Sequence, residues 1–463
     1  MNSKDSSPRG LGTPVEAEAF LEANPDIEAV QLVITDACGV ARGKNLAREE
    51  LSALYSSGRN VAGSILGLDI TGEDVDGTGL VWDVGDADQC CRPVAGSLGR
   101  TPWLDRPTAQ VLGTMYELDG RAARADPRHV LEAVVRRCAE AGFTPVVAVE
   151  LEFYLLQRDP QGQLLPSAGM LTGERRTRID AYGLARLDDM APLFDELYSA
   201  ARSLGLPLRT LMSEYAPGQF EITLEHRADA LRAVDEAILF KRAVRGIAAR
   251  HGRVACFMAK PFAQQAGSGM HLHASLADRS GRNACAADEP GGSPLLRQAI
   301  GGLRDTLAQG MAIYAPNANS YRRFRSMSYA PVAVSWGINN RTVSLRVPAG
   351  PPASRHVEHR VAGADANPYL VAALVLGGML HGISAGLDPG PAIEGNGYAQ
   401  PAQGTALPTQ WHAALATAAQ SPFLRDTLGP GFLDVFLAIK RQEAEKFGAL
   451  VSNRDYEWYL DTA

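Results

Sequence analysis

The sequence predicts a two-domain protein built from both strands and helices, and three observations support this. The chain has 463 residues, which is more than one compact core usually holds. Its first region contains several strand-like segments, and the longer second region alternates such segments with well-capped helices. The apolar fraction of 46% is ordinary for a soluble globular protein and argues against wholesale disorder.

The N-terminal region, residues 16–120, is predicted to be a sheet domain. It follows MNSKDSSPRGLGTP, which lacks an apolar signal core, and we expect residues 1–15 to form a flexible tail. DIEAVQLVITDACGVARGKNL alternates like two strands joined around Asp36 to Gly39, and then leads into a short helix. GLVWDVGD and TAQVLGTMYEL are predicted to be further strands.

The second region, residues 121–463, is predicted to be a larger domain. Asp126 and Pro127 form a good helix start, and the helix PRHVLEAVVRRCAEA stops at Gly142. A second long helix is expected over roughly residues 228–250. YLVAALVLGGMLHGI is interrupted by glycines and a histidine, which favours a packed helix over a membrane span. DPGPAIEGNGYAQPAQGTALP is predicted to be a long surface loop.

Charge and cysteine content narrow the class of function. Lysine and arginine number 45 against 52 aspartate and glutamate residues, which gives a net charge of −7 without long like-charge runs. We therefore expect neither nucleic acid nor a membrane as a partner. The six cysteines show no metal-ligand spacing and are too few for a disulfide scaffold, which favours a reducing cytoplasmic location.

The segment VVAVELEFYLL, residues 146–156, places two glutamates inside a predicted strand. Because side chains alternate between faces, one face is wholly apolar and the other carries Glu150 and Glu152. The carboxylates are about 7 Å apart along the strand, and their like charges require water, arginine or a cation nearby. From this segment alone, an ordinary sheet with one solvated face explains the pattern equally well.

The same division into an apolar and a polar face recurs in at least three other segments, namely FEITLE, GSGMHLHASL and RHVEHRV. Together with SEYAPGQ, NSYRRF and NNRTVSLRVP, these segments contribute Glu214, Glu221, Glu225, His271, His273, Ser275, Arg323, Arg341, Arg346, Glu358 and Arg360. A single histidine or arginine in such a pattern is more often structural. One active face, however, explains all of the segments together.

Acidic residues beside arginines point to a particular chemistry. Carboxylate oxygens suit Mg²⁺ or Mn²⁺, and one imidazole is compatible with either ion. Arginines grip phosphate and carboxylate groups with two parallel hydrogen bonds. Metals and arginines around anionic groups favour phosphoryl transfer, in which catalysis is mainly positioning and charge neutralisation. No Gly-x-x-x-x-Gly-Lys phosphate loop is present, so any nucleotide is held by a different scaffold.

Six motifs resemble the glutamine synthetase superfamily in their order and spacing. They are VELEFYL, SEYAPGQFE, KPFAQQAGSGMHLHASL, NSYRRF followed by APV, NNRTVSLRVP, and VEHRVAGADANPYLVAALVLGGMLHGI. The resemblance implies an α+β protein with an N-terminal β-grasp domain and a catalytic α/β domain that contains a curved antiparallel sheet. It also implies a ring-shaped homo-oligomer, generally a dodecamer. In the implied reaction, ATP activates the γ-carboxylate of glutamate as γ-glutamyl phosphate, which an amine then attacks.

The resemblance further implies roles for individual residues. Glu152, Glu214 and Glu221 match the ligands of one metal, and Glu150, His271 and Glu358 match those of a second metal that bridges the ATP phosphates. Gly267, His271, Arg323 and Arg360 match glutamate-binding positions. His273 and Ser275 match nucleotide contacts, and Arg341 and Arg346 match arginines that act on the phosphates. The implied cofactors are two or more Mg²⁺ or Mn²⁺ ions per site, with ATP as co-substrate.

Two departures from the ammonia-using members of that superfamily concern the acceptor. Their flap loop carries a glutamate directly before the AP motif, where this chain has Tyr329 in FRSMSYAP and no acid. Their N-terminal Asp-Gly-Ser-Ser motif is missing from VAGSILGLDITGED, although Asp69 and Glu73 lie nearby. An ammonium pocket needs compact negative charge, so Tyr329 in the catalytic site favours a larger amine. In this respect the chain resembles the γ-glutamylpolyamine synthetase branch.

The expected function is therefore an ATP-dependent glutamate–amine ligase whose amine, a polyamine or a monoamine, the sequence does not identify. An ammonia-using glutamine synthetase is one alternative. A non-catalytic structural member of the family is another, and the presence of all six matched metal ligands argues against it. Tyr398 lies where some bacterial members carry a tyrosine that is adenylylated, but its flanking sequence differs.

Overall fold

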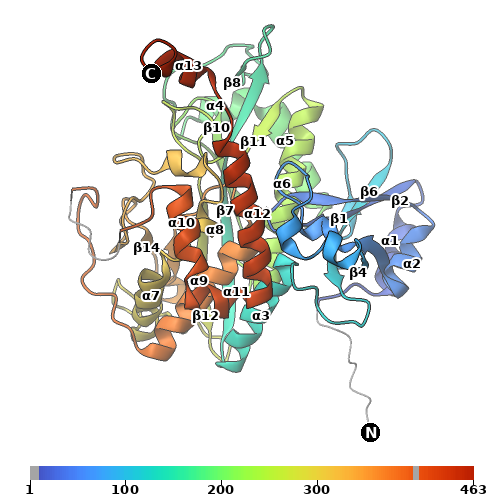
Figure 1. The fold of residues 1–463 in the computed structure, drawn as a ribbon, viewed down its shortest axis with the longest axis horizontal. Coiled ribbons are helices and arrows are strands. Elements are labelled where there is room, and N and C mark those ends of the chain that lie inside the picture. Colours follow the sequence, from blue (N-terminus) through green and yellow to red (C-terminus); the bar gives the residue numbers. More distant parts are fainter. Residues whose placement is uncertain (1–9, 400–405) are drawn as a thin grey trace.

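The computed structural model describes residues 10–399 and 406–463, which form two sheets with helices packed against them (Figure 1). The helices are α1 (Pro14–Ala23), α2 (Glu50–Ser57), α3 (Pro127–Glu140), α4 (Leu184–Asp189), α5 (Ala191–Ser203), α6 (Ala230–Arg250), α7 (Pro294–Thr306), α8 (Met311–Tyr314), α9 (Pro368–Ala385), α10 (Trp411–Ala419), α11 (Pro422–Leu428), α12 (Pro430–Gly448) and α13 (Asn453–Tyr459). Five short 3₁₀ turns supplement them within the described residues.

The N-terminal sheet has the strand order β2-β1-β6-β4-β3, with β5 paired to β6. Its strands are β1 (Ala29–Thr35), β2 (Ala41–Ala47), β3 (Arg59–Ala62), β4 (Asp88–Pro93), β5 (Gly99–Arg100) and β6 (Thr108–Tyr116). The predicted pair of strands followed by a short helix is confirmed as β1, β2 and α2. Strands β1 and β6 are parallel, and the other neighbours are antiparallel.

Two segments at the edges of this domain differ from the expectation. The strand predicted at GLVWDVGD is wrong, because Trp82–Val84 forms a 3₁₀ turn and Gly79 and Gly85 adopt left-handed conformations that interrupt an extended chain. Of the expected tail, residues 1–9 lie outside the described residues. Leu11 pairs with Val94, and helix α1 begins at Pro14.

The second sheet has the order β13-β14-β15-β12-β7-β10-β9, with β8 and β11 paired to β7. Its strands are β7 (Thr144–Arg158), β8 (Leu164–Pro166), β9 (Leu208–Ser213), β10 (Gln219–Leu224), β11 (Val254–Cys256), β12 (Met270–Ala277), β13 (Trp336–Ile338), β14 (Leu345–Val347) and β15 (Val357–His359). The predicted fold class is confirmed. Strands β13 and β14 are parallel, so the sheet is mixed and not purely antiparallel.

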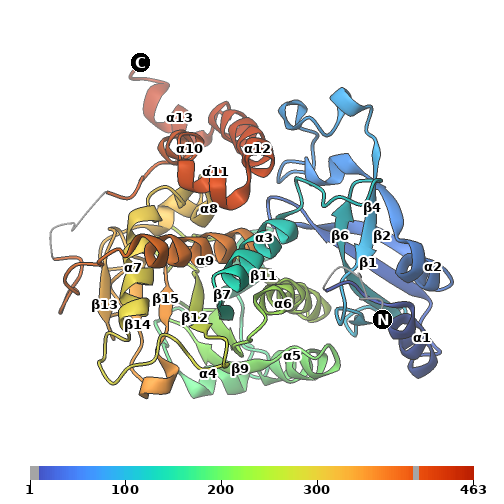
Figure 2. The ribbon, with the colours of Figure 1, turned by 90° about the horizontal axis from the view of Figure 1, so that it is seen from below.

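In the part of the chain that the structure describes, helices pack against one face of the long central strand β7. Figure 2 shows α3, α6, α7 and α9 along the sheet, and α3 and α6 contact β7 while α9 contacts β12. The apolar face of β7, which includes Val147, Leu151 and Phe153, is fully buried in the core they form. The polar side chains of β7 therefore project from the opposite face.

Helix α9 is a core helix, as its interrupted apolar run predicts. Its 18 residues are long and apolar enough to cross a membrane, but 78% of them are buried inside the protein. It contacts α3, α6 and α7, which shield it from solvent. Asn367 caps its N-terminus by accepting a hydrogen bond from the backbone of Tyr369.

A buried ion pair joins the three helices behind the sheet. Arg128 on α3 donates from Nε and Nη2 to the two carboxylate oxygens of Asp235 on α6, at 3.0 and 3.1 Å. The hydroxyl of Tyr369 on α9 donates to the same carboxylate at 2.7 Å. Because all three side chains are buried, the pair fixes the relative register of α3, α6 and α9.

The buried ion pair predicts a large loss of stability when only one of its two partners is removed. Arg128→Met should lower the free energy of unfolding by about 3–5 kcal/mol, since it leaves the Asp235 carboxylate buried without a counter-charge. Arg137→Met, which removes an exposed pair with Asp426, should cost no more than about 1 kcal/mol. Urea unfolding followed by tryptophan fluorescence measures both. Equal losses in the two variants would contradict the role given to Arg128.

Candidate active site

The registers of three neighbouring strands bring the acidic residues together. Glu221 on β10 lies directly opposite Glu152 on β7. On the other side of β7, His271 of β12 lies opposite Glu150. Since directly opposite residues share a face and have Cβ atoms about 4.5–5.5 Å apart, these side chains converge. The alternation predicted for residues 146–156 is confirmed, and the polar face carries a cluster of acids.

Among the described residues, three overlapping groups of side chains could each hold a cation. They are Glu152 with Glu214 and Glu221, Glu150 with Glu221 and His271, and Glu150 with His273 and Glu358. In each group the ligand atoms lie within 4.8 Å of one another. The first group is the set that the sequence assigned to one metal. The three residues assigned to the other metal are also adjacent, because His271 lies 2.5 Å from Glu150 and 3.7 Å from Glu358.

The carboxylates repel one another strongly. Burial, followed by the charges of Glu150 and Glu152, raises the pKa of Glu221 to about 11. Burial and the charge of Glu214 raise the pKa of Glu152 to about 8. Acids this crowded stay ionised only with positive charge in the site, and the donor set of carboxylate oxygens with imidazole nitrogen fits Mg²⁺ or Mn²⁺.

Arginine supplies positive charge at one end of the cluster. Arg346 donates to Glu358 at 2.6 Å, and Arg360 donates to the other oxygen of the same carboxylate. Burial would raise the pKa of Glu358, but Arg360 and the neighbouring histidines lower it to about 2. Within the described part of the chain, the Nε atoms of Arg346 and Arg360 are buried without a hydrogen-bond partner. Each arginine therefore keeps a donor for an anionic ligand.

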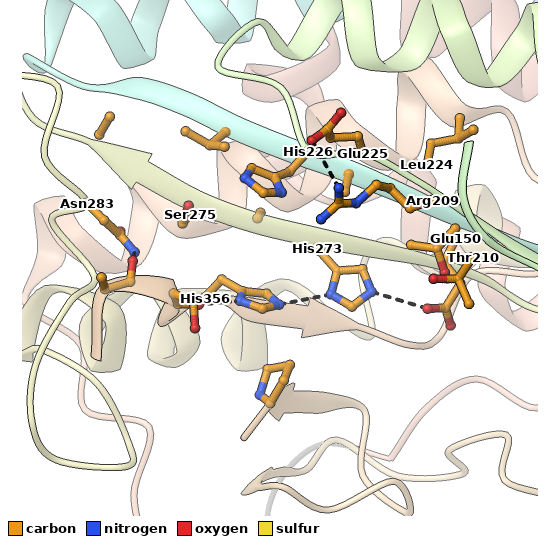
Figure 3. A pocket seen from close by; sticks show the side chains of 18 of the residues that line it. Glu150, Arg209, Thr210, Leu224, Glu225, His226, His273, Ser275, Asn283 and His356 are labelled. Atoms are coloured by element: carbon orange, nitrogen blue, oxygen red, sulfur yellow. Dashed lines mark hydrogen bonds and ion pairs between the residues drawn. The ribbon is translucent and has the colours of Figure 1, made fainter. Parts of the chain in front are cut away.

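A cavity of about 470 Å³ opens on the Glu150 side of the cluster (Figure 3). It is lined by three residues expected to contact ATP, namely His273, Ser275 and Arg346. His356 also lines it and was missed from the sequence. In Figure 3 its ring points at His273, with 3.0 Å between the ring nitrogens, and His273 in turn lies 3.5 Å from Glu150. His356 shares the alternating face of Glu358 and Arg360, so the strand pattern contained its signal.

A second cavity, of about 260 Å³, opens on the Glu152 side. It is lined by all four residues expected to bind glutamate: Gly267, His271, Arg323 and Arg360. Residues 325–330, which form the flap, line it as well, and Tyr329 is 58% exposed at its rim. Arg341 lines neither cavity, but it is close enough to act on the cluster: burial raises the pKa of Glu214, and the charge of Arg341 opposes that rise. Apart from Arg341, the residues expected to bind ATP and those expected to bind glutamate thus line separate cavities, which meet at the acidic cluster.

Asp69 and Glu73, the two acids near the position of the missing ammonium motif, make structural contacts. The buried Asp69 accepts from the backbone and hydroxyl of Thr71 and pairs with Lys446 of α12 at 2.7 Å. Lys446 also pairs with Glu73 at 2.6 Å. Neither acid lines the two cavities, so within one chain they do not replace the missing ammonium motif.

Comparison with known proteins identifies the family. Residues 124–459 match the family described as "Glutamine synthetase, catalytic domain". Because this match covers well over half of the chain, the protein belongs to the glutamine synthetase family, as its motifs predict. The chain is 40% identical over 459 residues to gamma-glutamylputrescine synthetase of Escherichia coli (strain K12), a match that covers 98% of this chain and 96% of that protein.

Two further relatives agree with this placement. Glutamate–isopropylamine ligase of Pseudomonas sp. is 32% identical over 447 residues, and the match covers 96% of each chain. A solved structure of GmaS in complex with ADP has a TM-score of 0.83 and 28% identity, and the match covers 96% of this chain and 99% of that one. The likeness thus extends over both domains.

The acidic cluster predicts a metal-dependent rise in thermal stability. Mg²⁺ or Mn²⁺ should raise the melting temperature, because a ligand that binds only the native state stabilises it by about 2.7 kcal/mol at 100 times its Kd. Glu152→Ala and Glu221→Ala should each remove most of that shift. Glu225→Gln removes a nearby carboxylate that belongs to none of the three groups, and should retain it. A full metal-induced shift in the Glu152→Ala, Glu221→Ala double variant, measured against EDTA-treated protein, would exclude the site.

Proposed function

We propose that the protein is an ATP-dependent ligase that joins the γ-carboxylate of glutamate to an organic amine. The observation that carries this proposal is the flap. Tyr329 stands where ammonia-using members carry a glutamate, and it lines the same cavity as Arg323 and Arg360. The two relatives named for their amines, putrescine and isopropylamine, support the same conclusion. Putrescine is the first acceptor to test because that relative shares 40% identity.

The acidic cluster is the proposed metal and phosphate site. Glu152, Glu214 and Glu221 would hold one Mg²⁺ or Mn²⁺ ion, and Glu150, His271 and Glu358 would hold another. When bound, these ions supply charge neutralisation for the phosphates of ATP. His273 and Ser275 would contact the nucleotide. Arg346, which lines the larger cavity and keeps an unpaired Nε, would neutralise the transferring phosphoryl group together with Arg341 on the adjoining segment.

Glutamate would occupy the smaller cavity. Arg360 has a buried Nε donor free for its carboxylate, and Arg323 is held beside it by hydrogen bonds from its guanidinium to the carbonyls of Val361 and Arg360. A Cβ on Gly267 would lie 2.6 Å from the carbonyl oxygen of Ala259 and 2.7 Å from Cγ of Arg323, so glycine is required there. The γ-carboxylate then reaches the acidic cluster between the two cavities.

The chemistry takes place in two steps. An oxygen of the γ-carboxylate attacks the terminal phosphorus of ATP, and ADP leaves. The amine nitrogen then attacks the acyl carbon, phosphate leaves, and the nitrogen loses a proton. Tyr329 has no carboxylate with which to attract or deprotonate ammonium. It offers an aromatic wall, a hydroxyl group and a cation–π contact worth about 0.5–2 kcal/mol to an ammonium-bearing acceptor.

The assembly and cellular location belong to the same proposal. We expect a ring of identical subunits, a dodecamer, in the cytoplasm. All six cysteines lie within the described residues and none forms a disulfide, which is consistent with a reducing compartment. Size-exclusion chromatography with light scattering measures the subunit number directly.

The first test of function is an acceptor panel. Phosphate release with ATP, Mg²⁺ and glutamate should be far faster with putrescine or an alkylamine than with ammonia. Tyr329→Glu should shift the ratio of kcat/KM values towards ammonia, because it restores an acid that can attract and deprotonate ammonium. Tyr329→Phe keeps the aromatic wall and should retain the amine preference. If wild-type kcat/KM for ammonia exceeds that for every amine, the protein is a glutamine synthetase instead.

The second test concerns the glutamate cavity. Arg360→Lys should raise the KM for glutamate at least tenfold, since lysine does not reproduce the planar guanidinium fork. Binding of ATP should change little. Isothermal titration calorimetry with each ligand separates the two effects. A loss of ATP affinity with glutamate affinity retained would show that Arg360 serves the other cavity.

A further inference from the structure

The flap is touched by a loop that lies far away in sequence, residues 393–399. Tyr398 of this loop donates a hydrogen bond from its hydroxyl to the carbonyl of Ala330, at 2.9 Å. Ala330 directly follows Tyr329, so this bond holds the flap backbone one residue beyond Tyr329. Asn396 of the same loop approaches the sulfur of Met327 at 3.8 Å. Tyr398 itself lines neither cavity.

The flap needs such support because its own conformation is unfavourable. Met327 and Tyr329 have φ angles of 60° and 58°, in the left-handed region that residues other than glycine rarely adopt. Both side chains are largely exposed, at 72% and 58%, so packing against the core does not hold them. Strained backbone of this kind persists only where surrounding contacts fix it. The bond from Tyr398 is one such contact, and Ser328, which donates to the carbonyl of Arg325 at 2.6 Å, provides another.

The supporting loop is itself anchored beside Arg341. The amide of Asn340 donates to the carbonyls of Ile393 and Gly395, at 3.1 and 2.9 Å. Thr342 accepts from the backbone of Gly397 at 2.8 Å and donates to Asn340 at 2.6 Å. A Cβ on Gly397 would lie 2.8 Å from the Thr342 hydroxyl, so the approach is too close for any other residue. The loop therefore connects the flap to the segment that carries Arg341.

We propose that Tyr398 is a positioning residue that sets acceptor specificity. It does so by holding Tyr329 at the rim of the smaller cavity, where the amine would enter. This inference rests on the proposed function. The Tyr398 hydroxyl acts through the Ala330 carbonyl and contributes no atom to the reaction. Its removal should loosen the flap and leave the arginines and acids of the smaller cavity in place.

Tyr398→Phe tests this with the loss of one oxygen atom. The KM for the amine should rise about two- to tenfold, the range given by one net hydrogen bond. The KM values for glutamate and ATP should stay within twofold. Phosphate release in the absence of amine should increase, because a looser flap admits water to the acyl phosphate. Thr342→Val, which frees the far end of the loop, should change the same parameters in the same direction.

Tyr198→Phe is the matched control, because Tyr198 lies on α5 and lines neither cavity. Hydrogen exchange of the peptide containing residues 325–331 should be faster in Tyr398→Phe than in wild type or the control. Unchanged exchange together with an unchanged KM for the amine would overturn the proposal. If wild type prefers ammonia, the proposed function fails, and the exchange measurement still decides whether Tyr398 holds the flap.

Discussion

The repulsion between acids on one face of strand β7 is the constraint on which the rest of the structure depends. Glu150 and Glu152 would each be tolerable alone at a solvated surface, but Glu221 and Glu214 are added to the same small volume, and burial weakens the screening by water. The opposite face of the strand is fully buried against the helices, so the strand is not free to turn the acids towards solvent. Positive charge within the site relieves the repulsion and lets the acids stay ionised.

Two arginines supply part of this positive charge, and each of them lines a different cavity. Arg346 and Arg360 both neutralise Glu358, from opposite sides of one carboxylate. Arg346 opens onto the larger cavity and Arg360 onto the smaller one. A single buried carboxylate therefore orients one cationic group towards each proposed substrate. The remaining acids of the cluster pair with no arginine in the described residues, and together with Glu358 and the histidines they form the donor set that suits divalent cations.

The local sequence pattern predicted which side chains share a face of each strand. Which residues of different strands and loops meet in the site depends on pairing between segments that are distant in sequence. The two-residue period placed Glu150 and Glu152 on one face, and the caps at Asp126 and Gly142 located helix α3. Period alone does not say that Glu221 lies opposite Glu152, because strand register depends on the fold as a whole. The segment around Trp82 was misjudged because apolar residues also occur in exposed turns. Tyr398 gave no signal of its contact, which joins two loops 68 residues apart.

The contrast between strands and loops explains how one site can serve different acceptors. The proposed metal ligands, except Glu214, lie on strands whose backbone bonds and apolar faces fix them, so the phosphate chemistry has little freedom to change. The proposed acceptor side is formed by the flap and its supporting loop, which are joined by single hydrogen bonds such as that from Tyr398 to Ala330. A substitution there alters a few contacts at the surface and leaves the core unaffected. Acceptor specificity can therefore diverge within the family while the arrangement of acids and arginines stays the same.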